Sequence, residues 1–242
     1  EEPEISVGLT EVYGVEDEER KINMNMSKLT QGNKTEYTKI LERLLPDPEG
    51  EEVLTRNDVI NAIIDWQDTD GPVGDAENSY YEGLEHPYKC KNSDFDFIEE
   101  LLLVKGVTPA FFEKIKDSIT VYSEGKVNVN TAPAEVLTAI LAYTELVEEV
   151  IKYRNGTDGE EGTEDDKFWT NANSFTIFLK NKGLKSENAN EIKQYFTTKS
   201  DNFRITSHGT VGKVTSRITC VVKRESGSKK EKRATYEYYH EE

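Results

Sequence analysis

The stretch Asp65-Trp66-Gln67-Asp68-Thr69-Asp70-Gly71 follows an amphipathic helical pattern and places three carboxylates within six residues, with Asp75 and Glu77 soon after it. Counted from Trp66, acids fall at the third and fifth positions and Gly71 at the sixth, as in the calcium loop of an EF-hand, but an indole at the first position cannot ligate. A solvated turn after a helix is the alternative explanation. The pattern predicts a structural calcium site whose candidate ligands are Asp65, Asp68, Asp70, Asp75 and Glu77.

Four segments around this stretch form an ordered set. The acidic run continues to Tyr88 as DWQDTDGPVGDAENSYYEGLEHPY, and the others are DEERKINMN at 17–25, EELLLVKG with VTP at 99–109, and KVNVNTAPAEVL at 126–137. Together they resemble the general secretion pathway protein K family, the large minor pseudopilin of bacterial type II secretion. An inserted Asp75, and Asn78 in place of an aspartate, depart from the family pattern and leave the ligand set open.

The resemblance implies a function in assembly. It implies a non-enzymatic structural subunit that caps the pseudopilus tip in a hetero-complex with the I-type and J-type minor pseudopilins, beside other secretion-system components. It also implies a place on the periplasmic side of the inner membrane. Members of this family carry a short leader and an apolar N-terminal helix, so we expect the membrane-spanning helix to precede the first residue of this chain.

Hydrophobic periodicity predicts an α+β fold. Residues 20–26 alternate as a half-buried strand does, and helical stripes follow from about residue 35 to residue 195. Prolines 109 and 133 suit the first turns of two of these helices. After Lys199 the period returns to two. The order strand, helices, strands favours an antiparallel sheet interrupted by a helical block.

This order predicts the domain boundaries. Residues 1–33 and 199–242 are expected to form one pilin-like antiparallel sheet, with residues 34–198 inserted as an all-helical domain. The strand at 21–26 is expected to share that sheet with strands at 204–209, 214–224 and 234–239, because an isolated hairpin at either end would be marginal.

Charge argues against a nucleic-acid partner. The 242 residues carry 47 acids against 30 bases, a net charge of −17, whereas binding to phosphate backbones gains affinity from Lys and Arg. The segments 102–107 and 128–133 are similar to helix-hairpin-helix modules, which makes nucleic-acid binding an alternative function, as is calcium-dependent surface adhesion. The second hairpin glycine is replaced by Thr108, so we interpret these segments as scaffolding.

The sequence contains no assembled catalytic motif. His86, His208 and His240 share no spacing with one another or with the acids, and no nucleophile motif surrounds Cys90 or Cys220. A disulfide between these cysteines is an alternative to free thiols. The acidic stretch 156–166, with six acids and three glycines, is expected to be a solvated loop, with a second cation site as its alternative.

Overall fold

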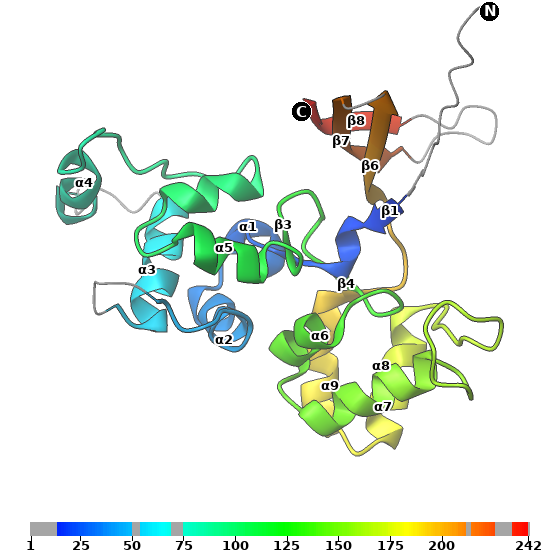
Figure 1. The fold of residues 1–242 in the computed structure, drawn as a ribbon. Coiled ribbons are helices and arrows are strands. Elements are labelled where there is room, and N and C mark those ends of the chain that lie inside the picture. Colours follow the sequence, from blue (N-terminus) through cyan, green and yellow to red (C-terminus); the bar gives the residue numbers. More distant parts are fainter. Residues whose placement is uncertain (1–13, 50–53, 69–74, 212–213, 226–233, 242) are drawn as a thin grey trace, which may run out of the picture. The chain divides into compact units, whose positions relative to one another are not determined.

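The computed structural model describes residues 14–49, 54–68, 75–211, 214–225 and 234–241, with only the backbone at 75–78 and 211. It separates into two compact units. The β unit combines Glu1–Glu18 with Ser200–Glu242, and the helical unit is Glu19–Lys199. The expected fold class, antiparallel sheet with a helical part, is confirmed (Figure 1). The units divide after residues 18 and 199, whereas the sequence predicted boundaries after 33 and 198.

The β unit is built on a four-stranded antiparallel sheet in the order β1-β6-β7-β8. Its strands are β1 (Gly14–Asp17), β6 (Asn202–Val211), β7 (Val214–Arg224) and β8 (Ala234–Glu241). The chain thus contributes one strand before the helical unit and three after it. The whole helical unit lies between β1 and β6 in sequence, although these two strands pair directly in the sheet.

One face of this sheet is apolar and open. The register places Val15, Ile205, Cys220 and Tyr239 in one row across all four strands. Val15 is 67% exposed and Tyr239 58% exposed, at the two edges of the row. Because side chains alternate along a strand, Ile218 and Val222 share this face with Cys220. Apolar side chains at this exposure are typical of a surface that another element covers.

The strand predicted at 21–26 was wrong in both extent and partner. Only Ile22–Asn23 (β2) is a strand, and it pairs in parallel with Ile119–Thr120 (β3) inside the helical unit. The alternation misled because both faces are buried: Met24 is 0% exposed and Asn25 is 4% exposed. The asparagines lie inside the unit because their amides bond to backbone groups there.

The helical unit contains mostly short helices (Figure 1). Its α-helices are α1 (Met26–Leu29), α2 (Lys34–Leu44), α3 (Arg56–Gln67), α4 (Asp75–Glu82), α5 (Pro109–Ile115), α6 (Ala134–Leu141), α7 (Thr144–Arg154), α8 (Ala172–Asn181) and α9 (Ser186–Ile192). Three 3-10 segments, η1 (Glu18–Arg20), η2 (Ile98–Leu103) and η3 (Lys193–Tyr195), and the paired strands β4 (Val127–Asn128) and β5 (Phe196–Thr197) complete it.

Local signals explain where several of these helices begin. Thr55 caps α3 through a reciprocal capping box with Asp58. Pro109 occupies the first turn of α5, as expected, whereas Pro133 stands one residue outside α6, at its N-cap. The residues predicted as a helix at 97–103 form the 3-10 segment η2. Its shorter turn leaves Leu102 41% exposed and Leu103 44% exposed.

A buried polar network connects the start of the helical unit to its helices. The Tyr37 hydroxyl donates to the Met24 carbonyl and accepts from the Gln67 amide. The same Gln67 side chain accepts from the Met26 N–H at 2.8 Å. Burial raises the pKa of the Tyr37 hydroxyl, so it stays protonated and keeps donating. These bonds fix the segment 23–26 against α2 and α3, where hydrophobic contacts alone would allow it to slide.

Candidate functional site

The predicted calcium ligands lie at two helix ends. Asp65 is in the last turn of α3 and Asp68 is its C-cap, while Asp75 begins α4, which also contains Glu77. Asp70 lies outside the described residues, as do the side chains of Asp75 and Glu77. Among the side chains that are described, no group of three or more metal-binding residues converges.

Asp68 already has a partner. Its Oδ2 accepts from the Lys34 ammonium at 2.8 Å, and the Asp68 side chain is only 13% exposed. This ion pair joins the start of α2 to the end of α3. A cation at Asp68 would have to share the carboxylate with Lys34 or displace it, because both need its oxygen lone pairs.

Aromatic residues of the same sequence stretch form a cluster beside α3. The Trp66 ring lies edge-on to Tyr81, with centroids 5.5 Å apart, and Tyr88 lies 6.2 Å from Trp66. Trp66 and Tyr81 are buried, and burial raises the pKa of the Tyr81 hydroxyl. Ring packing among these described residues therefore holds α4 and the turn that follows it against α3.

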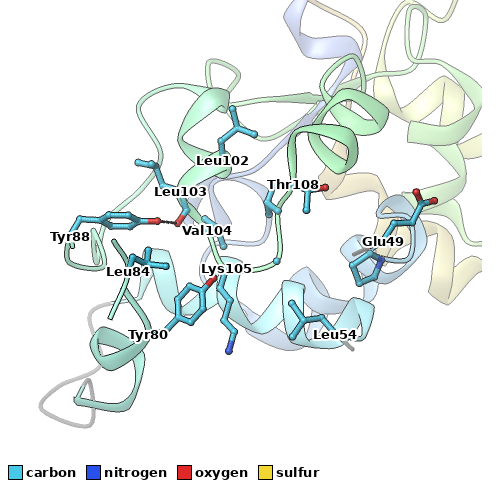
Figure 2. Close-up of a pocket in the computed structure, with 13 residues that line it drawn as sticks. Glu49, Leu54, Tyr80, Leu84, Tyr88, Leu102, Leu103, Val104, Lys105 and Thr108 are labelled. Atoms are coloured by element: carbon cyan, nitrogen blue, oxygen red, sulfur yellow. Dashed lines mark hydrogen bonds between the residues drawn. The ribbon is translucent and has the colours of Figure 1, made fainter. Parts of the chain in front are cut away.

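A groove opens next to this cluster (Figure 2). It is a cavity of about 370 Å³ between η2, the turn before α5, α4 with the residues that follow it, and the segments that precede α3. Tyr88 closes one end by donating its hydroxyl to the Leu103 carbonyl at 2.7 Å. We call this cavity the η2 groove; its principal wall residues are Leu54, Tyr80, Leu84, Tyr88, Leu102 and Leu103.

Lys105 brings a charge to the η2 groove. Its ammonium lies 4.7 Å from the centroid of the Tyr80 ring, at cation–π distance. Figure 2 shows the Lys105 side chain extending alongside Tyr80 at the edge of the groove. The backbone turns sharply after Lys105 at Gly106, whose φ of +83° and contact with Val59 leave no space for a side chain. The sequence analysis assigned this segment to scaffolding and missed the groove, because the exposure of Leu102 and Leu103 depends on tertiary packing.

The acidic stretch 156–166 forms a loop held by its own hydrogen bonds. Asp165 accepts from the Thr157 and Thr163 hydroxyls and from the backbone N–H groups of Thr157 and Asp158. These bonds hold the pKa of the Asp165 carboxyl well below its usual range, the Thr157 hydroxyl being the main cause. The solvated loop predicted here is organised by one carboxylate that bonds to the loop itself.

The remaining chemistry-bearing residues do not form a reactive site within the described chain. Cys90 and Cys220 are free cysteines. The buried Cys90 donates to the carbonyl of Asp65. His208 lies 3.5 Å from the Arg217 guanidinium, and His240 is near Tyr238, in the β unit. His86 is in the helical unit.

Among the described residues, no helix has the length and apolar character that crossing a bilayer requires. This agrees with the mean hydropathy of −0.71 for the chain.

Comparisons with known proteins give a consistent result. Residues 20–124 match the family model for type II secretion system (T2SS), protein K. No curated protein matches the chain by sequence. A chain of the solved GspK-GspI-GspJ complex from the enterotoxigenic Escherichia coli type 2 secretion system matches with a TM-score of 0.70 and 14% identity, over 95% of this chain and 79% of that chain.

The two matches complement each other. The family model covers the first part of the helical unit, including residues 20–25 of the first segment and the segments at 65–88 and 99–109 that carry the resemblance in sequence. The solved structure extends the likeness in fold to almost the whole chain, β unit included. By sequence over residues 20–124, and by fold over almost its whole length, the chain is similar to protein K of the type II secretion system, a minor pseudopilin.

Proposed function

We propose that this protein caps the tip of the pseudopilus as a non-enzymatic subunit, in a hetero-complex with I-type and J-type minor pseudopilins. The observation that carries the proposal is the open apolar face of the β unit, which presents Val15, Ile205, Cys220 and Tyr239 in one row. A sheet with a half-exposed apolar face gains stability when a helix or another subunit covers it. The fold of a chain from the GspK-GspI-GspJ complex supports I-type and J-type partners.

The helical unit suits a cap because it folds around its own core. That core includes fully buried side chains from α2, α3, η2 and α6, among them Tyr37, Ile60, Leu101 and Leu137. A unit with its own core does not need the sheet's apolar face for its own stability. That face remains for an apolar N-terminal helix, which we propose anchors the protein in the inner membrane with this chain on the periplasmic side.

Reconstitution of the complex tests the assembly. The chain should co-elute with I-type and J-type pseudopilins of the same bacterium in size-exclusion chromatography with light scattering. Tyr239→Asp, at the open edge of the apolar row, should reduce that co-elution. Thr210→Asp is the matched control, because Thr210 is exposed on the opposite face of β6. Equal assembly by both variants would remove the apolar face from the interface, and no co-elution of the unmodified chain would refute the proposed complex.

We also propose structural calcium binding around the end of α3 and the start of α4. The support is the presence of Asp65, Asp68, Asp70, Asp75 and Glu77 within thirteen consecutive positions of the sequence. Carboxylate oxygens are the ligands that Ca²⁺ prefers, and a bound ion would reduce the entropy cost of ordering the residues that supply them. The Lys34–Asp68 pair competes for one of these ligands, so Lys34→Met should strengthen binding.

Calorimetry after chelation tests the calcium proposal. Titration with CaCl2 should release or absorb heat, and millimolar calcium should raise the melting temperature. Asp70→Ala should abolish both effects, while Asp158→Ala, in the other acidic loop, should leave them unchanged. Absence of heat and of a melting shift would refute calcium binding, and loss of both only in Asp158→Ala would transfer the ion to the loop at 156–166.

A further inference from the structure

The η2 groove continues into a second cavity. This cavity, of about 310 Å³, is lined by polar residues of α3, including Asp58 and Asn61, and it shares Leu54, Tyr80 and Lys105 with the groove. Lys105 therefore stands where an apolar compartment meets a polar one. Both cavities lie inside the helical unit and are formed by described residues.

The apolar compartment exposes side chains that a folded domain normally buries. Leu102 is 41% exposed and Leu103 is 44% exposed on consecutive positions of η2. Leu84, Tyr80 and Tyr88 form the facing wall and are partly buried against the core. Each Å² of such surface removed from water contributes about 25 cal/mol, so an inserted apolar side chain would be bound favourably. Concave, aromatic-lined surfaces of this kind are typical of peptide-binding grooves.

Lys105 defines the charge that fits beside that side chain. Another lysine near the groove already has a partner, since Lys114 pairs with Glu49, which lines the groove. Lys105 makes no ion pair within 4 Å with any carboxylate of the described residues, and its ammonium rests on the Tyr80 ring. The nearby Asp58 carboxylate accepts from the Thr55 N–H and hydroxyl through Oδ2, and it interacts with the Lys105 charge only at longer range. A carboxylate arriving at the groove would therefore meet an ammonium that has no competing ion pair among these residues.

We propose that the η2 groove binds a segment of another polypeptide in which an apolar side chain is followed by a carboxylate. The apolar side chain enters the cavity lined by Leu84, Leu102 and Leu103, and the carboxylate pairs with Lys105. A protein segment fits better than a nucleic acid, because the walls are apolar and one ammonium cannot follow a phosphate backbone. This inference rests on no part of the assembly proposed above, since the groove lies wholly within the helical unit.

Binding of short peptides to the full 242-residue chain tests the proposal. The probes are acetyl-Gly-Leu-Leu-Glu-Gly-amide, the same peptide with Lys in place of Glu, and one with two Ser in place of Leu. Backbone amide spectra recorded during titration should shift and saturate with the Leu-Leu-Glu peptide only, at Leu103, Lys105 and Val107. Saturation by all three peptides, or shifts at another surface, would overturn the proposal. So would the absence of saturation by any peptide up to about 5 mM, which we take as the weakest useful affinity.

Charge reversal supplies the decisive variant. Lys105→Glu should lower the affinity for the Leu-Leu-Glu peptide by about fivefold or more, because a contact of opposite charges becomes one of like charges. For the same reason, the Leu-Leu-Lys peptide should become the better ligand. Lys116→Glu is the control for a change of net charge, since Lys116 is the C-cap residue of α5 and does not line the groove. An unchanged preference in Lys105→Glu would refute the role of Lys105. Displacement of the peptide by a single-stranded oligonucleotide would favour nucleic-acid binding instead.

Discussion

Asn25 joins two segments of the helical unit that lie 70 residues apart. Its Oδ1 accepts from the Phe95 N–H at 2.7 Å, and its Nδ2 donates to the Phe95 carbonyl at 3.1 Å. Asn25 is 4% exposed and Phe95 is 3% exposed, so little water reaches either group. The Asn25 amide thus satisfies both backbone groups of one buried residue, as a paired strand would.

The magnitude of an Asn25→Ala substitution follows from these contacts. It removes two hydrogen bonds and leaves a buried N–H and a buried C=O at Phe95 without the partner that satisfied them. Each unsatisfied group costs about 1–3 kcal/mol. We expect the free energy of unfolding of the helical unit to fall by about 3–5 kcal/mol, the lower value applying if a water molecule fills the space.

Tryptophan fluorescence during urea unfolding measures this change. The protein has two tryptophans, and both Trp66 and Trp169 lie in the helical unit, so their signal isolates that unit from the sheet. Asn190→Ala is the control, because Asn190 is exposed on α9 and should change the free energy by less than about 0.5 kcal/mol. Asn25→Asp should be at least as damaging as Asn25→Ala at neutral pH, since it buries a carboxylate against the Phe95 carbonyl. A loss below about 1 kcal/mol for Asn25→Ala would refute the importance of the paired amide.

Two further substitutions and one pH titration test other parts of the fold. Gly125→Ala should destabilise the helical unit by more than about 3 kcal/mol, because φ is +84° and a Cβ would lie 2.1 Å from the Lys28 carbonyl oxygen. Gly159→Ala is the control in the same fluorescence assay: its φ is +78° but the space around it is open, so it should cost only about 1 kcal/mol. For Asp165, the hydroxyl of Thr157 lowers the pKa of the carboxyl in the folded state. The contribution of Asp165 to stability is therefore present above the unfolded pKa and is lost as pH falls through the folded pKa. NMR titration of the carboxyl should show this depression, and a pKa at the ordinary value would contradict it. Arg204→Ala removes a guanidinium bonded at 2.6 Å to the fully buried Glu18 and should destabilise the β unit by about 3–5 kcal/mol. Circular dichroism of the tyrosines should detect this loss, while the unfolding transition followed by tryptophan fluorescence stays in place. A shift of the tryptophan transition alone would contradict the prediction.

The sequence predicted the fold class because periodicity over long segments is a strong signal. Period two across β7, from Val214 to Arg224, and helical stripes in α2 and α3 needed no tertiary information. The first strand of the sheet was missed, because Gly14–Asp17 holds one apolar residue and is too short to show alternation. The alternating segment at 21–26 attracted the assignment instead, although tertiary contacts bury both of its faces.

The candidate sites depended more on tertiary structure. The acids around Asp65 and Asp68 could be found from composition and spacing, but the ion pair of Asp68 with Lys34 joins residues 34 positions apart and has no local signal. The η2 groove likewise required the tertiary structure around a 3-10 segment, in which the adjacent Leu102 and Leu103 remain partly exposed. Three residues line both the groove and the adjoining cavity, and they come from three separate segments of the chain: Leu54, Tyr80 and Lys105.

The chain leaves the β unit for the helical unit after Glu18 and returns to it at Ser200, and hydrogen bonds within the β unit join these two ends. Before the insertion, Asp17 accepts from the Ser200 hydroxyl at 2.6 Å, and Glu18 accepts from the Arg204 Nε at 2.6 Å. These contacts bridge 183 and 186 residues of sequence, and they lie next to the pairing of Asp17 with Phe203 in the sheet. Closing so long a loop costs only slightly more entropy than closing a shorter one, because the cost grows with the logarithm of length. A large helical unit is therefore tolerated between β1 and β6 as long as this junction and its buried ion pair are kept, and its size can vary without altering the register of the sheet.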